Sequence, residues 1–212
     1  MPAAKPKPIL FPAGPLPWLK PAVLAGGLAP LAGIAAGAAR GTLGANPIAE
    51  ALNELGLLAL IFLVASLACT PAQTIAGWKW PIRIRKTLGL LSFFYAALHL
   101  ITYAAIDQAL AWKTILEDIA KRPFIMVGFA AFLILVPLAV TSTSGMLKRL
   151  GAARWKRLHR LAYVAAVLAV THFVLRVKKD VSEPAAYGAV LGVLFLIRIV
   201  AFVRERRAAR PF

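Results

Sequence analysis

Cysteine is almost absent from this chain of 212 residues, because Cys69 is the only one. A single cysteine excludes an intramolecular disulfide, a CxxC redox motif and a thiolate cluster that could hold zinc or an iron–sulfur centre. We interpret Cys69 as a small apolar residue within a helix, the common role of a lone cysteine in an apolar segment.

Catalytic and nucleotide-binding motifs are absent as well. The sequence contains no P-loop, GxGxxG, HExxH or GxSxG pattern. Only eight residues are acidic, and the adjacent pair Glu117 and Asp118 lies in a polar segment that we interpret as a solvated surface. Any chemistry is therefore expected to come from a bound cofactor, and whether the chain itself is an enzyme stays open.

Long apolar segments, in contrast, fill most of the chain. Hydrophobic residues make up 60% of the sequence and the mean hydropathy is +0.76. A membrane-spanning helix needs about 20 mainly apolar residues, and several segments meet this requirement. They are residues 18–39, 51–70, 87–107, 123–141, 158–176 and 185–203. The sequence thus predicts an all-α integral membrane protein, a bundle of six transmembrane helices.

Prolines support these boundaries. A missing backbone N–H is tolerated at or just outside a helix end, where we place Pro47, Pro71, Pro81, Pro123 and Pro184. Pro137 falls inside the fourth span, where it is expected to kink the helix. We divide the chain into a Pro-rich N-terminus (1–17), a transmembrane domain (18–204) and a basic tail (205–212).

Charge is distributed unevenly between the predicted loops. The formal net charge is +17, from 25 basic and 8 acidic residues. With a cytoplasmic N-terminus, most basic residues fall on the inner side, whereas Glu205 is the only acidic residue there. The positive-inside rule therefore predicts that both termini are cytoplasmic. Attraction of the inner loops to anionic membrane lipid accounts for the net charge, so nucleic acid is not expected as a partner.

The three histidines, His99, His159 and His172, all fall within or at the edge of predicted spans. An ionisable ring inside a membrane is costly and usually functional. A rise of about 1.5 Å per residue puts His99 about 18 Å and His172 about 21 Å from the inner ends of the third and fifth spans. Two histidines at matched depth on different helices are what the two axial ligands of one haem b require.

His159 lies near the inner end of the fifth span, about 20 Å from His172. We predict it as a third haem-ligand candidate, at an inner level that would complete an electron path across the membrane. On an ideal helix, however, it points about 140° away from His172. Its counterpart on the third span is Lys86, next to Arg85, and these cations are expected either to pair with haem propionates or to be interfacial charges.

Three other features carry weaker predictions. Tyr103 and Trp112 either line a cofactor or belong to an interfacial aromatic belt, and the belt is favoured. The hydroxyl-rich segment TSTSG (141–145) is expected to cap a helix and form a turn. The segment KRLGAARWKRLHR (148–160) is expected to be an inner loop, with docking of an acidic cytosolic donor or of a flavin phosphate as an alternative role.

Six spans with histidines on the third and fifth resemble the ferric-reductase-like transmembrane domain family. Within that family, the chain looks like the haem-binding membrane subunits of bacterial periplasmic methionine-sulfoxide reductase systems. The likeness lies in LGANP (43–47), RIRKTLGL (83–90), LHLITYA (98–104), KRPF (121–124), LAVTSTSGM (138–146) and LGAARWKRLHRLAYVAAVLAVTHFVLRVK (150–178). It covers about residues 40–200, and the last segment, with two of the histidines, is the most specific.

This resemblance implies a transmembrane haem b conduit in the bacterial inner membrane. The family takes electrons from the quinone pool or a cytosolic flavin reductase and passes them to a periplasmic molybdopterin-containing reductase that repairs oxidised methionine. His99, His159 and His172 carry over as ligands of the haem iron, with one or two haems, and the catalytic site is expected on the partner. FMN is also ascribed to the family, but no residue indicates its site. Because no nucleotide-binding domain follows the last span, the electrons are expected to be borrowed from such a donor.

Two other functions stay open at this point. A metal-ion reductase would keep the haem and change the electron acceptor. A non-redox transporter or assembly protein would use the histidines to relay protons or to pack. Broken helices and buried carboxylates are typical of transporters, but no acidic residue lies deep in a predicted span and only Pro137 interrupts one.

Overall fold

The computed structural model describes residues 16–177 and 179–208, and all regular structure within these ranges is helical. The elements are α1 (Leu19–Arg40), α2 (Pro47–Ala76), α3 (Trp80–Ile101), the π-helix η1 (Thr102–Asp107), α4 (Trp112–Lys121), α5 (Pro123–Val140), α6 (Ser144–Leu150), α7 (Ala152–His159), α8 (Leu161–Arg176) and α9 (Ser182–Ala208). The predicted all-α fold is thereby confirmed.

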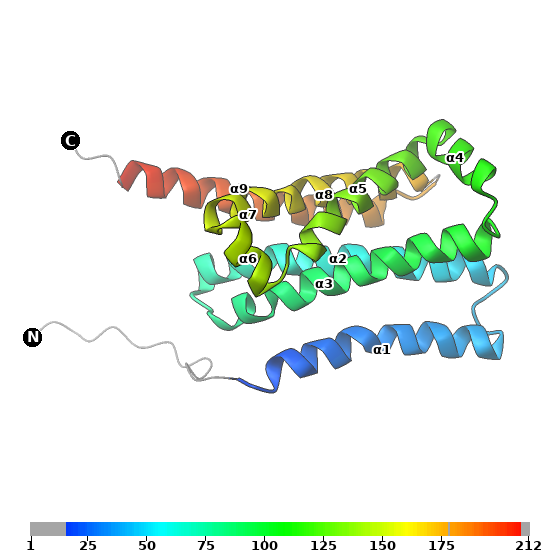
Figure 1. The fold of residues 1–212 in the computed structure, drawn as a ribbon, viewed down its shortest axis with the longest axis horizontal. Coiled ribbons are helices and arrows are strands. Elements are labelled where there is room, and N and C mark those ends of the chain that lie inside the picture. The colour runs from blue at the N-terminus through cyan, green and yellow to red at the C-terminus, as the bar shows by residue number, and fades with distance from the viewer. Residues whose placement is uncertain (1–15, 178, 209–212) are drawn as a thin grey trace, which may run out of the picture.

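Six helices of this bundle are long and apolar enough to cross a membrane. They are α1, α2, α3 continued by η1, α5, α7 together with α8, and α9. Successive spans run in opposite directions, so that α1 begins and α9 ends at the same end of the bundle (Figure 1). The chain is a multi-pass membrane protein, as predicted, and the cytoplasmic location of this end stays a prediction.

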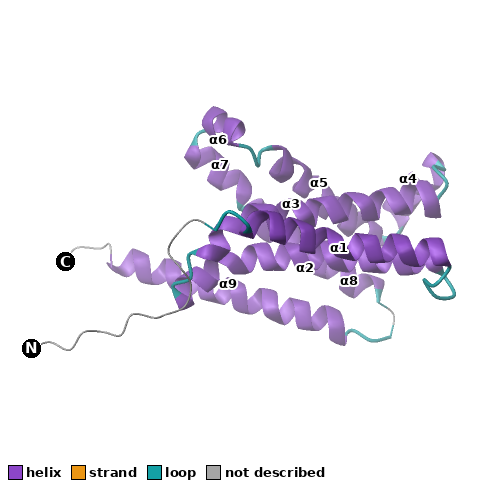
Figure 2. Ribbon diagram, turned by 90° about the horizontal axis from the view of Figure 1, so that it is seen from below, coloured by secondary structure: helices purple, strands orange, loops and turns teal. Residues whose placement is uncertain are grey.

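Two helix pairs form the centre of the bundle. Helix α2 packs mainly against α3, and α5 packs mainly against α8, while α9 lies on α8 and α2 (Figures 1 and 2). Among the described residues, the largest buried cluster joins α2, α5, α8 and α9 through Leu60, Leu63, Val64, Leu67, Leu135, Leu138, Ala165, Ala166, Leu191 and Leu194. Lipid tails are as apolar as these side chains, so close packing and interhelical hydrogen bonds hold such helices together.

The outermost helix, α1, approaches α3 closely at Gly27. A Cβ atom on Gly27 would lie 2.4 Å from Cδ1 of Leu91, so a larger residue here would force the Leu91 side chain to shift. The fully buried Tyr95 of α3 donates its hydroxyl to the carbonyl oxygen of Gly27 over 2.6 Å. These contacts attach a helix that is otherwise largely exposed to lipid.

Pro71 lies inside a helix, where the sequence predicted a helix end. Helix α2 continues to Ala76, so the prediction was wrong at this point. Proline has no N–H, and the carbonyl of Leu67, four residues earlier, therefore loses its helical hydrogen bond. Nη2 of Arg198 on α9 donates to that carbonyl oxygen over 2.6 Å. An interhelical contact thus replaces the missing backbone bond.

The segment 148–160 is also more regular than predicted. In place of a loop it forms the short helices α6 and α7, and the hydroxyl of Thr143 caps α6, as expected for this hydroxyl-rich stretch. The fifth span is interrupted at Arg160, between α7 and α8. His159 and His172 therefore do not lie on one ideal helix, and the expected angle of about 140° between them does not apply.

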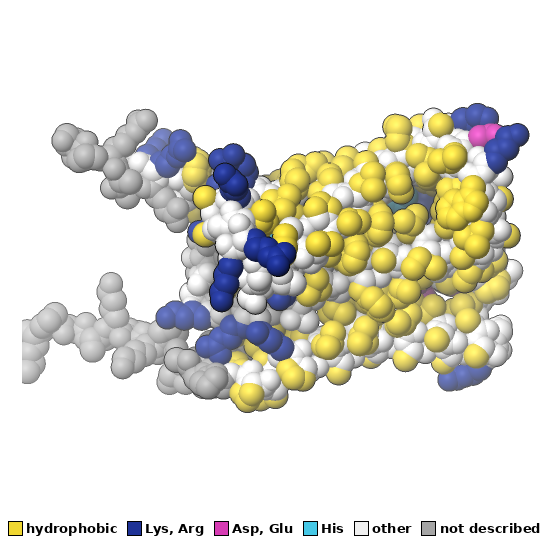
Figure 3. Space-filling model, viewed as in Figure 1, with side chains coloured by type: hydrophobic (Ala, Val, Ile, Leu, Met, Phe, Trp, Pro, Cys, Tyr) yellow, Lys and Arg dark blue, Asp and Glu magenta, His cyan; other side chains and the backbone are white. Residues whose placement is uncertain are grey.

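Basic side chains gather at one end of the bundle, which we call the basic end (Figure 3). It comprises the α2–α3 connection, α6, α7 and the last turns of α9, and an apolar band separates it from the opposite end, over which α4 lies. Helix α9 extends to Ala208, into the predicted tail 205–212. Residues 209–212 and nearly all of the predicted N-terminal segment 1–17 lie outside the described residues.

Candidate functional site

His99 on α3 and His172 on α8 face one another between the two central helix pairs. Their ring centroids lie 6.2 Å apart and their planes are inclined at 83°. The prediction that they lie at matched depth is confirmed. The helices that carry them are parallel in direction and belong to different pairs, so the site depends on the assembly of the whole bundle.

One nitrogen of each ring is engaged by the backbone of the partner helix. Nδ1 of His99 donates to the carbonyl oxygen of Leu52 on α2 over 2.9 Å, and Nδ1 of His172 donates to that of Phe124 on α5 over 2.6 Å. A carbonyl oxygen can only accept, so both Nδ1 atoms carry the proton. The lone pair of each neutral ring is therefore on Nε2, the atom available to bind a metal ion.

A glycine makes room for each ring. A Cβ atom on Gly56 would lie 3.2 Å from Nδ1 of His99, and one on Gly128 would lie 2.6 Å from Nδ1 of His172. Gly56 follows Leu52 by one helical turn, and Gly128 follows Phe124 in the same way. The two helix pairs thus repeat one arrangement. In each, a backbone carbonyl accepts a hydrogen bond from an imidazole, and the glycine one turn later leaves space for the ring.

These two imidazoles would suit an iron ion, which they would hold through Nε2. Two metal–nitrogen bonds of about 2 Å each, together with the ring radii, separate the centroids of such a pair by about 6 Å. The observed separation of 6.2 Å agrees with this value. Elsewhere among the described residues, no group of three or more His, Cys, Asp or Glu side chains could hold a metal ion.

Polar residues lie next to this pair on the side of α4. Arg176, one turn after His172 on α8, donates from Nη1 to the side-chain oxygen of Asn53 on α2. It is close enough to act electrostatically on both His99 and His172. A cation at this position suits an anionic group at the outer edge of the site, such as a carboxylate of a bound cofactor.

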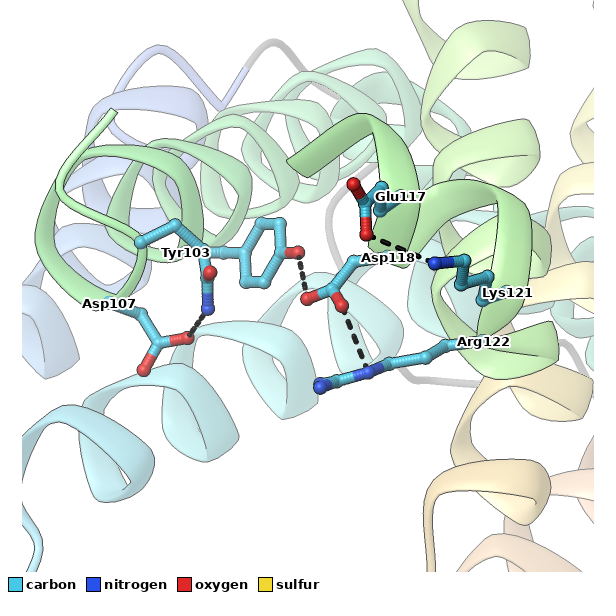
Figure 4. A network of polar contacts seen from close by, with 7 residues as sticks. Tyr103, Asp107, Glu117, Asp118, Lys121 and Arg122 are labelled. Atoms are coloured by element: carbon cyan, nitrogen blue, oxygen red, sulfur yellow. Dashed lines mark hydrogen bonds and ion pairs between the residues drawn. The ribbon is translucent and has the colours of Figure 1, made fainter. Parts of the chain in front are cut away.

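A second network closes the same end of the bundle (Figure 4). The hydroxyl of Tyr103, one turn after His99, donates to Asp118 of α4 over 2.8 Å, and Nε of Arg122 lies 3.0 Å from the same carboxylate. Asp118 is only 7% exposed, so the interpretation of this residue as solvated was wrong, whereas its neighbour Glu117 forms an exposed ion pair with Lys121. The polar partners of Asp118 lie outside its own helix, so the local sequence does not indicate that this residue is buried.

Trp112, the second aromatic residue predicted here, is exposed, whereas Tyr103 bonds to Asp118. Trp112 begins α4 and is 65% exposed, as expected for an interfacial aromatic residue. Between them the chain turns through Ala109 and Leu110, two residues with positive φ angles of 46° and 59°. Such angles are uncommon outside glycine, and here they join the π-helix that follows His99 to the helix that covers the end of the bundle.

His159 lies in another cluster, at the basic end. Its ring stacks on Trp155 with a centroid distance of 3.8 Å, and its Nε2 lies 3.0 Å from Oγ1 of Thr141. That hydroxyl donates its hydrogen to the carbonyl of Pro137 over 2.6 Å, so Nε2 of His159 donates to it. The proton is thus on the opposite nitrogen from that in His99 and His172. The structure brings two of the three predicted ligands together and the third to a separate place.

Sequence comparison places the chain among known proteins. The family described as "Ferric reductase like transmembrane component" matches residues 54–170. A protein of Rhodospirillum rubrum named "Protein-methionine-sulfoxide reductase heme-binding subunit MsrQ" is 52% identical over 89% of this chain and 91% of its own length. Proteins of the same name from Deinococcus radiodurans and Caulobacter vibrioides are 49% and 47% identical, over 92% and 81% of this chain and 96% and 81% of their own lengths.

Identity of this extent over nearly the whole bundle includes the segments that bear all three histidines. The chain belongs to the ferric-reductase-like transmembrane family and, within it, to the MsrQ haem-binding subunits of protein-methionine-sulfoxide reductase.

Proposed function

We propose that this chain is the membrane subunit that binds haem b and passes electrons across the inner membrane to a periplasmic molybdopterin-containing reductase, which reduces methionine sulfoxide in oxidised proteins. The electrons come from the quinone pool or from a cytosolic flavin reductase. The observation that carries the proposal is the facing pair His99 and His172, with both Nδ1 atoms bonded to backbone carbonyls. The name shared by the relatives supports the cofactor and the reductase system.

In this proposal His99 and His172 bind the haem iron through Nε2. When bound, the haem supplies a centre that gains and loses one electron. The carbonyls of Leu52 and Phe124 hold the rings in one tautomer and one orientation, and their hydrogen bonds raise the basicity of the ligand nitrogens. Arg176 is the residue placed to neutralise a propionate on the side of α4.

His159 has another role in this proposal. Its Nε2 hydrogen bond to Thr141 has to break before that atom could bind iron, and the stacked Trp155 holds the ring in place. We therefore assign His159 to the donor side, near Arg85, and not to the pair that holds the haem between α3 and α8. A second haem at this level would need a ligand from a residue other than His99 and His172.

The distribution of charge supports the direction of transfer. The basic end faces the cytoplasm in this proposal, because its lysines and arginines remain beside anionic lipid. The end covered by α4 then faces the periplasm, and the histidine pair lies nearer to that side. This places the site within reach of a periplasmic acceptor.

A spectroscopic experiment tests the proposal. The chain is purified in detergent, and reduced-minus-oxidised visible spectra are recorded together with haem content per polypeptide. We expect the bands of a six-coordinate b-type haem. A well-folded preparation that takes up no haem contradicts the proposal.

A transfer assay identifies the acceptor. Reduced chain is mixed either with a purified periplasmic methionine-sulfoxide reductase or with ferric chelates, and the rate of haem reoxidation is followed. The chelates are chosen so that their difference in redox potential from the haem equals that of the reductase. Faster reoxidation by the reductase supports the methionine-sulfoxide pathway. Equal or faster reoxidation by the chelates indicates a metal-ion reductase instead.

A further inference from the structure

The short helices α6 and α7 form a hairpin at the basic end of the bundle. Together with the residue that follows α7 it carries six cations, and all of them are exposed: Lys148, Arg149, Arg154, Lys156, Arg157 and Arg160. We call residues 144–160 the cationic hairpin. Figure 2 shows α6 and α7 projecting to one side of the bundle rather than beyond its end. A segment placed in this way lies along the surface of the membrane that surrounds the bundle.

One face of α7 is held against the end of α5. Nε1 of Trp155 donates to the carbonyl oxygen of Thr141 over 2.9 Å, and Nε2 of His159 donates to the hydroxyl of the same threonine over 3.0 Å. The two rings also stack on each other. Since successive residues of a helix are turned by about 100°, Arg157 points about 180° away from the midpoint of Trp155 and His159. The cations of α7 are thereby turned away from the bundle.

The charge of the cationic hairpin is not balanced by the chain itself. No acidic residue occurs in the sequence from 119 to 179. Among the residues that the structure describes, the ion pairs lie on α4 and at its end, on the opposite side of the membrane-spanning band. Arg154 and Arg157 are three residues apart, and Lys156 and Arg160 are four apart, so like charges are neighbours along α7 and repel one another. An anion from outside the chain relieves this repulsion.

Depth indicates which anion is within reach. The apolar part of the fifth span begins at Leu161, which is 38% exposed and directly follows Arg160, so this point marks the edge of the hydrocarbon region. At a rise of about 1.5 Å per residue, Lys156 and Arg157 lie at most about 8 Å beyond it. The head-group region is about 5–8 Å thick. The phosphates of phospholipids are therefore at the level of these cations, whereas a soluble protein approaches from beyond them.

An exposed apolar side chain supports this placement. Leu147 on α6 is 40% exposed next to Lys148. Apolar and basic side chains exposed together on a short helix are typical of segments that lie in the membrane interface. A surface that meets only water and a soluble partner gives no such reason for the exposed leucine.

We propose that the cationic hairpin is a binding site for anionic phospholipids, with Lys156, Arg157 and Arg160 contacting the phosphate groups. The contacts of Trp155 and His159 with Thr141 hold these cations toward the head groups. The proposal goes beyond a general attraction of basic segments to lipid, because it assigns binding to one place at the basic end. It requires neither haem nor a reductase partner and does not depend on the proposed function.

Lipid-dependent thermal unfolding of the full chain in dodecyl maltoside tests this site. Phosphatidylglycerol or phosphatidylcholine is added in mixed micelles, and the rise in melting temperature gives an apparent dissociation constant. The unchanged chain is compared with the double variant Lys156→Gln, Arg157→Gln. The control is Arg206→Gln, Arg207→Gln, which removes the same charge from exposed positions in the last turn of α9.

We expect phosphatidylglycerol, and not phosphatidylcholine, to raise the melting temperature in a saturable way. Removal of one cation next to lipid phosphate weakens binding about fivefold, so the hairpin variant should bind about 25-fold more weakly. The α9 variant should change the dissociation constant by less than about threefold. If the hairpin variant melts lower without lipid, the single variants Arg157→Gln and Arg207→Gln provide the same comparison.

Three outcomes overturn the proposal. The first is an equal effect of the two lipids on the unchanged chain. The second is an equal loss of affinity in the hairpin and α9 variants, which would leave only the general attraction of basic segments to lipid. The third is a rise in melting temperature with soluble poly-glutamate that equals the rise with phosphatidylglycerol and is lost in the hairpin variant. That result would indicate an acidic protein as the partner of this surface.

Discussion

The imidazole rings of His99 and His172 face one another at 6.2 Å with their planes nearly perpendicular, at 83°. If these two rings hold a low-spin ferric haem, as proposed, their crossed planes would give it a strongly anisotropic electron paramagnetic resonance signal. We expect such a signal from the oxidised chain. A rhombic signal typical of parallel imidazoles would contradict the ring orientation found here.

Removal of either ring is expected to abolish that signal. In the proposed function, His99→Ala and His172→Ala each delete one of the two nitrogens proposed to hold the iron, so we expect low-spin haem to be lost from both variants. His159→Ala serves as the matched control, because His159 bonds to Thr141 and stacks on Trp155. It should retain the haem and slow its reduction from the donor side. Loss of all haem from folded His159→Ala contradicts this division of roles.

The two glycines offer a finer test of how the rings are held. A methyl group on Gly128 would meet Nδ1 of His172 at 2.6 Å, and one on Gly56 would meet Nδ1 of His99 at 3.2 Å. We expect Gly128→Ala to lengthen the hydrogen bond to Phe124, lower the basicity of the ligand and raise the midpoint potential of the haem. Gly56→Ala should have the same effect, but a smaller one, because the contact is less severe.

Gly192→Ala is the control for these variants, since a Cβ atom there meets nothing within 4 Å. Potentiometric titration of all three variants provides the measurement. If Gly128→Ala lowers thermal stability but leaves the potential of the bound haem at the value of Gly192→Ala, the glycine serves packing and does not position the ligand.

Much of this architecture was predictable because membrane insertion imposes strong rules on sequence. Hydropathy alone located the six spans, since a helix must satisfy its backbone internally and must be long enough to cross. Depth then paired His99 with His172, because the rise per residue is fixed in a helix. No neighbour from another helix had to be known for either inference.

What escaped prediction depends on contacts between distant segments. The burial of Asp118 comes from Tyr103 on another element, and the tolerance of Pro71 inside α2 comes from Arg198 on α9. Gly56 carried a weak signal, because small residues mark close helix contacts, but many glycines in this chain meet nothing. The role of such a residue is decided by its partner, which a single sequence does not identify.

The adjacent carboxylates of α4, Glu117 and Asp118, allow the effect of an exposed and of a buried carboxylate on stability to be compared. Asp118 is buried and bonded to Tyr103 and Arg122, so Asp118→Ala takes the acceptor from a half-buried hydroxyl and a half-exposed guanidinium and should cost about 1 kcal/mol of unfolding free energy. Glu117→Ala removes an exposed ion pair with Lys121, which contributes about 0.5 kcal/mol or less. Thermal unfolding of the two variants in detergent measures the difference.

Because Tyr103 follows His99 by one turn, Asp118→Ala should also loosen the end of the bundle above the histidine pair and release haem faster on heating, while Glu117→Ala retains it. Equal melting temperatures for the two variants would show that the network shown in Figure 4 does not hold α4 against the bundle.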